Sequence, residues 1–282
     1  WSNVEDIRTY LYEQYQQLTP RLEGVILVGN IPYARLWIHT CNAVDGCREQ
    51  SAITYEFYQD LDGTFRKTNP AFPEVYSEHT GNLNHEIWTS QLPMFGDYVA
   101  TQDAIVEYLS KNHQYRTNLQ TNHSFIQIEH HQRATTLTDA QNIINRLMHG
   151  EYSIVPSNHR FVNQHYFFHN TSGFGTPADG YGALSSNSTY DFFELDDHAD
   201  HNQIGLINSD WLSSNMLNAA FVLFTGCNTA QLDAPTSPIA VQSLYHINSK
   251  AVLLFGTTIT SGGLGQTAEG YFSKAILKKL FE

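Results

Sequence analysis

The chain has 282 residues, of which 41% are hydrophobic and 13% aromatic, and its 15 basic and 28 acidic residues give a formal net charge of -13. This composition is typical of a folded globular protein and excludes a disordered chain. The negative charge would repel nucleic acid and anionic lipid, so neither is expected as a partner. No apolar run approaches the roughly 20 residues of a membrane span, so no membrane insertion is expected.

The first half of the chain predicts helices and strands with one long interruption. Val4, Ile7 and Leu11 recur at helical spacing, and the apolar run from Gly24 to Gly29 is typical of a buried parallel strand. The stretch from there to about residue 95 is rich in loops. The predicted elements are a helix over 4–18, a strand over 24–29, a strand over 85–89, a helix over 100–112, a strand over 124–129 and a helix over 138–149.

The second half has a clearer order of strands and helices. Strands that alternate with helices indicate a mainly parallel sheet covered on both faces, and ligands of such sheets bind beyond the carboxyl ends of the strands. The length allows a single domain over 1–282, or two similar α/β subdomains over about 1–120 and 121–282. The predicted elements are a strand over 190–195, a helix over 209–217, a strand over 221–225, a helix over 238–247, a strand over 251–257 and a helix over 266–281.

The three cysteines differ in their surroundings. Cys41 and Cys47 lie close together in a polar loop, whereas Cys227 follows an apolar segment. The simplest interpretation is a local disulfide between the first two and one free thiol, because exposed thiols this close oxidise readily. The alternative is two unpaired loop cysteines in a reducing compartment. The chain also begins at Trp1 with a helix under way, so we expect a piece of a longer precursor that is secreted or displayed at the cell surface.

Cys227 is a candidate nucleophile. It follows the buried strand predicted over 221–225, and Gly226 lets the backbone turn tightly before it. A loop at the end of a rigid strand exposes the sulfur and offers backbone N–H groups to an oxyanion. On residue type alone, the commoner alternative is a buried cysteine that acts as a small hydrophobic side chain.

Two histidines could act as the base. His198 and His201 follow the preceding predicted strand, within an acidic run. If the two strands are neighbours, the thiol and an imidazole would face each other, and a carboxylate could orient the imidazole. The alternative is a solvated acidic loop. The candidate orienting acids are Asp196, Asp197 and Asp200.

Several segments follow one another in an order that is seen in one family. A strand ends near His198, a short helix follows, a second apolar strand ends at Gly226-Cys227, and a third strand reaches Thr258. This order resembles the catalytic core of the gingipain family, which are caspase-like cysteine peptidases. Upstream, the segments that carry the resemblance are 24–32, 58–63 and 86–93.

The resemblance implies both a fold and an activity. The implied fold is α/β, a caspase-like three-layer sandwich with a mainly parallel sheet flanked by helices. The implied activity is that of a cysteine endopeptidase that acts on protein or peptide substrates without an organic cofactor. Such peptidases are joined to flanking domains of the same precursor, so we expect these as partners too.

The resemblance also assigns roles to residues. It makes Cys227 the nucleophile and His198 the base, with His201 as the alternative base. The N–H groups of Cys227 and Ala199 would hold the oxyanion. Ala199 stands where the family has a glycine after its histidine, and if that glycine needs a positive φ, alanine costs about 1 kcal/mol or more.

Asp60 and Asp62 are candidate calcium ligands. They lie in the segment Asp60-Leu-Asp62-Gly63, where two carboxylates on one side of a turn suit the oxygen coordination of calcium. The family resemblance also suggests structural calcium. The alternative is a plain turn, in which Asp and Gly are common without any ion.

Two rival functions remain open at this point. One is a peptidase-like binding or surface-assembly module that keeps the fold without catalysis, for which Ala199 is the main support. The other is a metallohydrolase in which the Asp and His side chains of the run from Asp196 to His201 bind a transition metal. The second leaves the segment around Cys227 without a role.

Overall fold

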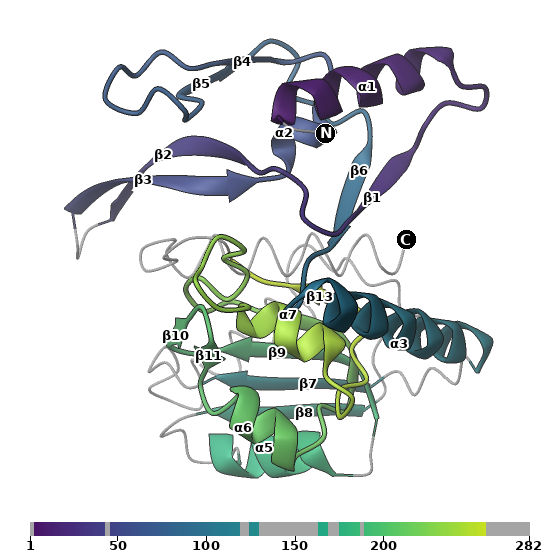
Figure 1. Cartoon of the computed structure of the whole chain (residues 1–282). Coiled ribbons are helices and arrows are strands. Elements are labelled where there is room, and N and C mark those ends of the chain that lie inside the picture. The colour runs from purple at the N-terminus through teal and green to yellow at the C-terminus, as the bar shows by residue number, and fades with distance from the viewer. Residues whose placement is uncertain are drawn as a thin grey trace. The chain divides into compact units, whose positions relative to one another are not determined.

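The computed structural model describes residues 3–42, 46–118, 124–129, 163–168, 175–186 and 189–257 (Figure 1). The chain forms two compact units, Trp1–Gln102 and Asp103–Glu282, and each unit has its own hydrophobic core. The alternative with two subdomains set the boundary near residue 120, whereas the two units divide after residue 102. Among the described helices, none combines the length and the apolar character that crossing a membrane requires.

The first unit opens with the predicted helix. Helix α1 spans Val4–Gln17, and its first turn is capped by the Asn3 side chain, which accepts a hydrogen bond of 2.7 Å from the Asp6 N–H. Strand β1 (Gly24–Val28) confirms the strand predicted there and pairs in parallel with β6 (Trp88–Leu92). Strand β6 begins three residues later than its prediction from residue 85. The remaining short elements of this unit are α2 (Glu56–Gln59), β4 (Thr64–Arg66) and β5 (Glu78–Thr80).

A hairpin replaces part of the predicted loop. Strands β2 (Ala34–Asn42) and β3 (Gly46–Thr54) pair antiparallel over their whole length, so the prediction of a loop around the two cysteines is wrong. The register sets Cys41 directly opposite Cys47. The side chains of residues 38–50 lie outside the described part of the structure. The sequence over 40–50 is mostly polar and lacks the apolar run that marks a buried strand, so its pattern favours a loop.

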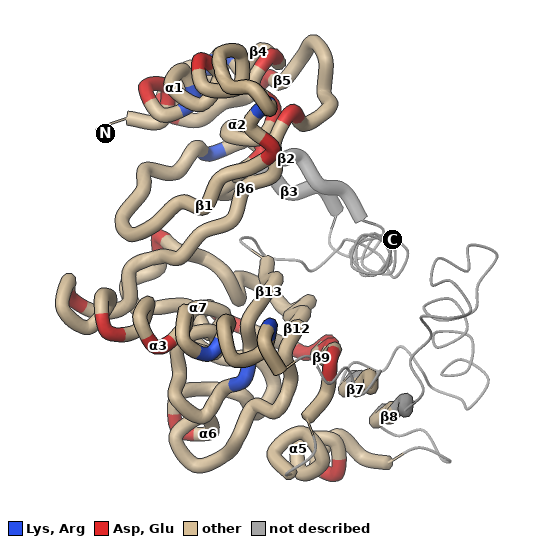
Figure 2. Tube along the Cα trace, turned by 90° about the vertical axis from the view of Figure 1, so that its right-hand side faces the viewer, with Lys and Arg blue, Asp and Glu red and all other residues tan. Residues whose placement is uncertain are grey.

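The second unit is built on a parallel sheet. Its five strands lie in the order β13-β12-β9-β7-β8, and every described pair is parallel. Figure 2 views this sheet almost along its strands, which form one row. The chain moves outward from β7 to β8 and then returns to β9 on the other side of β7, so the strand order reverses between β7 and β9. The strands are β7 (Ser124–Glu129), β8 (Asn163–Phe168), β9 (Tyr190–Asp196), β12 (Ala219–Phe224) and β13 (Leu253–Phe255).

Helices pack against this sheet. On one face, buried residues of the strands pack with Leu184 of α5 (Pro177–Ser185), Leu212 of α6 (Ser209–Ser214) and Ile239 of α7 (Ile239–Tyr245). On the other face, Tyr115 of α3 (Tyr98–Thr117) contacts Phe221 edge to face, with ring centroids 5.7 Å apart. The predicted fold class, a mainly parallel sheet flanked by helices, is therefore confirmed. The strand residues of the first face are Ile126, Ile128, Phe193, Leu195, Val222 and Phe224.

Some predicted boundaries differ from those observed. Helix α6 ends at Ser214 instead of at residue 217, because Asn215 takes an extended conformation. Strand β8 and helix α5 have no counterpart in the prediction. The helices predicted over 138–149 and 266–281 lie outside the described residues.

Candidate active site

The loops that carry the two candidate catalytic residues leave adjacent strands. Strands β9 and β12 pair in parallel, and their register sets Leu195 against Phe224. The Thr225 N–H continues the ladder by donating to the Leu195 carbonyl over 3.0 Å. His198 and Cys227 each stand three residues beyond the pair of Leu195 and Phe224, at the same edge of the sheet. The condition set by the sequence, that the two strands be neighbours, is met.

The two loops also touch. A β-carbon built on Gly226 would lie 2.4 Å from the Cβ of Ala199 and 2.7 Å from the Asp197 carbonyl oxygen, both far inside van der Waals contact. Glycine at position 226 therefore allows the segment before Cys227 to lie against the residues on either side of His198. Ala199 itself belongs to a short antiparallel pair, β10 (Ala199–Asp200) with β11 (Gln203–Ile204).

Cys227 lies at the start of a tight turn. Its residue is partly buried, and the next residue, Asn228, has a φ of 57°. Asparagine is one of the few residues other than glycine that adopt this left-handed conformation readily. The Asn228 carbonyl accepts a hydrogen bond of 3.0 Å from the Gln231 N–H, which closes the turn. The turn directs the chain away from the strand end directly after the candidate nucleophile.

Alanine at position 199 brings no backbone strain. Among the described residues other than glycine, only Asn228 has a positive φ, and Ala199 is an extended strand residue. The Gly205 N–H donates to the His198 carbonyl over 3.1 Å, so the neighbouring pair of Ala199 and Ile204 is a non-hydrogen-bonded pair of the ladder. The Ala199 N–H consequently points away from β11. The cost expected from a positive φ at this position does not arise.

The aspartates around His198 are held by other groups. Asp197 is buried, and its carboxylate accepts hydrogen bonds from the His198 backbone N–H over 2.6 Å and from the Tyr181 hydroxyl. Burial, together with the nearby Asp197 charge, raises the pKa of Tyr181, so the phenol stays protonated. Asp196 is also buried. Acidic residues mark the end of β9 in Figure 2.

The two candidate histidines differ in their surroundings. His198 is exposed, whereas His201 is partly buried and contacts groups through both ring nitrogens. His201 Nδ1 lies 3.0 Å from an Asp200 oxygen, and Nε2 lies 2.9 Å from Thr236 Oγ1. Hydrogen bonds from the backbone and side chain of His201 lower the pKa of Asp200. Asp200 is thus a partner of His201, which links the loop after β9 to the loop before α7.

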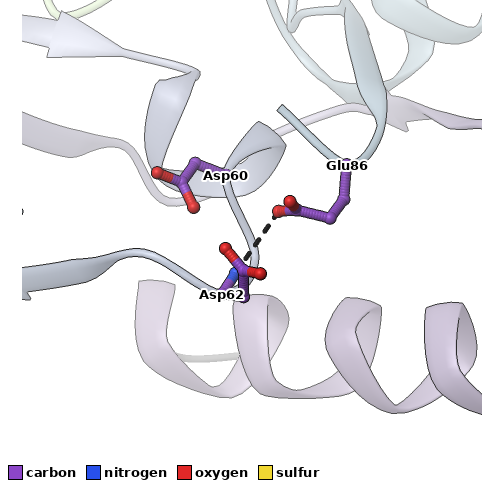
Figure 3. Close-up of side chains that lie close together, drawn as sticks. All are labelled: Asp60, Asp62 and Glu86. Atoms are coloured by element: carbon purple, nitrogen blue, oxygen red, sulfur yellow. Dashed lines mark hydrogen bonds between the residues drawn. The ribbon is translucent and has the colours of Figure 1, made fainter. Parts of the chain in front are cut away.

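A group of three carboxylates lies in the first unit. Asp60, Asp62 and Glu86 each offer an oxygen, and these oxygens lie within 4.8 Å of one another (Figure 3). The donor set is therefore all oxygen, which calcium prefers. It includes both aspartates that the sequence marked, together with Glu86, which the sequence did not mark.

Protein groups already contact this cluster. Asp60 is fully buried, and its carboxylate accepts from the Gly63 N–H over 2.5 Å and lies 2.6 Å from His79 Nε2. The Arg8 guanidinium donates to the carbonyls of Asp60 and Gly63. Figure 3 shows Glu86 reaching the backbone N–H of Asp62. The polar groups of this turn thus already have hydrogen-bond partners, as expected of a plain turn without an ion. Any cation bound there would compete with the Arg8 guanidinium for the negative charge of the carboxylates.

Within the described part of the chain, Asp60, Asp62 and Glu86 form the one group of three or more potential metal ligands. The run from Asp196 to His201 does not form such a group.

Comparisons with known proteins identify the fold. No protein-family model and no curated protein matches the chain. A solved structure described as "Structure of Protease" matches with a TM-score of 0.62 at 13% identity, over 96% of this chain and 52% of that one. The Arg specific cysteine proteinase gingipain R matches with a TM-score of 0.58 at 13% identity, over 92% of this chain and 54% of that one. The chain thus spans about half the length of these two proteins and shares the fold of the matched halves, which is a gingipain-like peptidase fold.

Proposed function

Because the chain has a gingipain-like peptidase fold, we propose that it is a cysteine endopeptidase in which Cys227 is the nucleophile and His198 the base. The observation that carries the proposal is the register of β9 and β12. It places the ends of the two strands side by side, with His198 and Cys227 each three residues beyond the paired residues Leu195 and Phe224. The contact between Gly226 and Ala199 supports the same arrangement.

In the proposed reaction, the Cys227 sulfur attacks the carbonyl carbon of a peptide bond, and the thiol proton passes to the His198 imidazole. The carbonyl oxygen becomes an oxyanion, for which the N–H groups of Cys227 and Ala199 are the proposed donors. The orientation of the Ala199 N–H away from β11 supports this role. The intermediate then expels the amine, which takes the proton from His198, and leaves an acyl-enzyme. A water molecule, deprotonated by His198, releases the acyl group and regenerates the thiol.

His198 is preferred to His201 as the base for a structural reason. Both ring nitrogens of His201 contact other groups, Asp200 and Thr236, and these contacts would have to break before the ring could exchange a proton with the thiol. A base must be able to accept a proton from the thiol and return it to the leaving group. The bonds of His201 suit a residue that holds two loops together.

The proposal is tested with a mixed peptide library, in which cleavage sites are mapped by mass spectrometry. We expect cleavage by the wild-type chain, none by Cys227→Ala, and a loss of about 100-fold or more in His198→Ala, the range usual for removal of a general base. His201→Ala is the matched control and should retain most of the activity. Cleavage that survives in Cys227→Ala would contradict the mechanism.

An inactive peptidase-like module is the main rival, and a thiol-directed probe separates the two. Selective labelling of native Cys227 that depends on His198 supports the enzyme. A native chain that neither cleaves peptides nor reacts at Cys227 would favour the module.

A further inference from the structure

The peptide bond between Gly226 and Cys227 is held from the side opposite the candidate oxyanion donor. Two threonine hydroxyls donate to the Gly226 carbonyl. One is Thr229 Oγ1, at 3.5 Å, and the other is Thr257 Oγ1. Thr229 follows the candidate nucleophile by two positions, whereas Thr257 lies two residues beyond the end of the neighbouring strand β13.

The two threonines also bind each other. The Thr257 N–H donates to Thr229 Oγ1 over 3.0 Å, and the Thr257 carbonyl accepts from the Ala230 N–H over 2.8 Å. A hydroxyl group has one proton to donate and two lone pairs that accept, so Thr229 Oγ1 can serve both the Gly226 carbonyl and the Thr257 N–H at once. Thr229 is fully buried, which keeps water from replacing these bonds.

The close approach of the strand end to this turn depends on a second glycine. A β-carbon on Gly256 would lie 2.9 Å from Thr229 Oγ1 and 3.0 Å from the Cβ of Ala230. The segment after β13 therefore lies directly against the turn after the nucleophile, and the Thr257 side chain reaches past it to the Gly226 carbonyl.

A peptide unit is planar, and in the trans form its carbonyl and its N–H point in opposite directions. Fixing the Gly226 carbonyl therefore fixes the direction of the Cys227 N–H. We propose that Thr229 and Thr257 are positioning residues that orient the Cys227 N–H toward the oxyanion of the reaction. This inference rests on the proposed function. It adds a pair of residues that act through the backbone and do not touch the substrate.

The inference separates two reactions of the same thiol. Acylation of Cys227 by p-nitrophenyl acetate passes through an oxyanion, so it needs the oriented N–H. Alkylation by iodoacetamide displaces iodide directly at a carbon atom and forms no oxyanion. A variant that loses only the orientation of the N–H should therefore slow the first reaction and leave the second unchanged.

The experiment compares the two rates in Thr229→Val and in Thr257→Val. We expect acylation to fall about 10-fold to 100-fold, somewhat less than the loss on deleting an oxyanion donor, with iodoacetamide alkylation within about 2-fold of wild type. Thr229→Ser and Thr257→Ser keep the hydroxyl and should restore acylation. In peptide cleavage, the loss should lie in kcat and not in KM.

Thr101→Val is the matched control. Thr101 is also buried, and its hydroxyl lies within hydrogen-bond distance of the backbone carbonyls of Phe95 and Asp97, but it belongs to the first unit. We expect no change in either rate. The two valine variants each leave one hydroxyl on the Gly226 carbonyl, so if one fails to fold, the other still decides the question.

Unchanged acylation in a folded valine variant would overturn the positioning role, and so would an equal fall of acylation and alkylation, which would mean that the thiol itself had moved. These results leave the proposed function intact provided that wild-type acylation is lost in Cys227→Ala. Absence of any acylation at Cys227 in the wild type would instead overturn the proposed function and the inference together.

Discussion

Gly226 and Ala199 lie so close that a methyl group on the glycine would sit 2.4 Å from the methyl group of the alanine. The contact joins the loop before the candidate nucleophile to the loop after the candidate base. We expect Gly226→Ala to lower the free energy of unfolding by about 1 to 3 kcal/mol, because the added carbon overpacks a buried site. Urea denaturation measures this change.

A double variant and a control sharpen this prediction. In Gly226→Ala with Ala199→Gly, the methyl clash is gone and part of the lost stability should return, although the Asp197 carbonyl still lies 2.7 Å from the new carbon. Gly182→Ala has open space around its new carbon and should be neutral or stabilising. A Gly226→Ala protein as stable as wild type would mean that the two loops are farther apart than described.

Asn228 follows the candidate nucleophile with a φ of 57°, a conformation that glycine adopts without cost. We expect Asn228→Gly to keep the stability of the wild type within a few tenths of a kcal/mol and Asn228→Ala to lose about 1 kcal/mol. The pair should be compared by urea denaturation and by the rate of Cys227 labelling. Equal stability of the two variants would argue against a left-handed turn at this position.

Because the Lys111 ammonium group is largely buried, we expect the stability of the second unit to depend on pH. Its ammonium group donates to the carbonyls of Leu244 and Ser249 over 2.7 and 3.0 Å. Burial lowers the pKa of Lys111 from 10.5 to about 8, an effect that the nearby Glu107 charge opposes. Burial and the charge of Lys111 also lower the pKa of His246.

The sign follows from proton binding. Between the folded pKa of about 8 and the unfolded value of 10.5, the unfolded chain binds more protons, so the Lys111 contribution to stability rises with pH across this window. Below it, lysine is charged in both states and the burial cost is present in full. Relative to Lys111→Met, the wild type should gain no more than about 3 kcal/mol from pH 7.5 to pH 10.5. A difference between the two proteins that stays constant with pH would contradict this assignment.

The disulfide between Cys41 and Cys47 stays a prediction, and the hairpin register makes it testable. Directly opposed residues of an antiparallel pair have Cα atoms about 4.5 to 5.5 Å apart, which lies inside the range of disulfides. We expect iodoacetamide to modify one of the three cysteines in the denatured, non-reduced protein and all three after reduction, as read by intact mass. Three modified thiols before reduction would disprove the bond and weaken the expectation that the protein is secreted or displayed at the cell surface.

Calcium at Asp60 and Asp62 also stays a prediction, now with Glu86 as a third candidate ligand. Because Arg8 and His79 already contact this turn, we expect binding only at millimolar calcium, the weak end of the range for protein sites. Calcium should then raise the thermal midpoint of the wild type and leave that of Asp62→Asn unchanged. If calcium shifts the thermal midpoint of neither protein, the cluster binds no calcium and serves only to contact Arg8 and His79.

The elements that were predictable from the sequence are those whose local pattern and burial agree. Strand β12 is a continuous apolar run, and α1 shows its buried face at helical spacing. Strand β9 carries three acidic residues, but its central Phe192 and Phe193 still favour a strand. Helix α5 was missed although Thr176 caps it and binds Asp179, because Gly180 and Gly182 interrupt its nine residues. The β2–β3 hairpin was missed because its sequence over 40–50 is mostly polar and has no apolar run.

The candidate site was predictable only where a residue type carries its chemistry. A thiol and an imidazole after strands can be found by inspection, but Thr229 and Thr257 are ordinary residues until folding sets their hydroxyls on one carbonyl. Glu86 and Arg8 are likewise separated from Asp60 in the chain and meet it only through tertiary packing. Contacts between distant segments leave no local pattern in a single sequence.

The equal distance of His198 and Cys227 from the last paired residues of β9 and β12 bears on how the chain can change over evolutionary time. An insertion in the connection around α6 would leave the register of the two strands unaltered. One residue added inside β9 would instead turn every later side chain to the opposite face of the sheet. Descendants of this chain can therefore lengthen or shorten their connections, whereas the proposed function requires the count of residues from each strand end to His198 and to Cys227 to stay fixed.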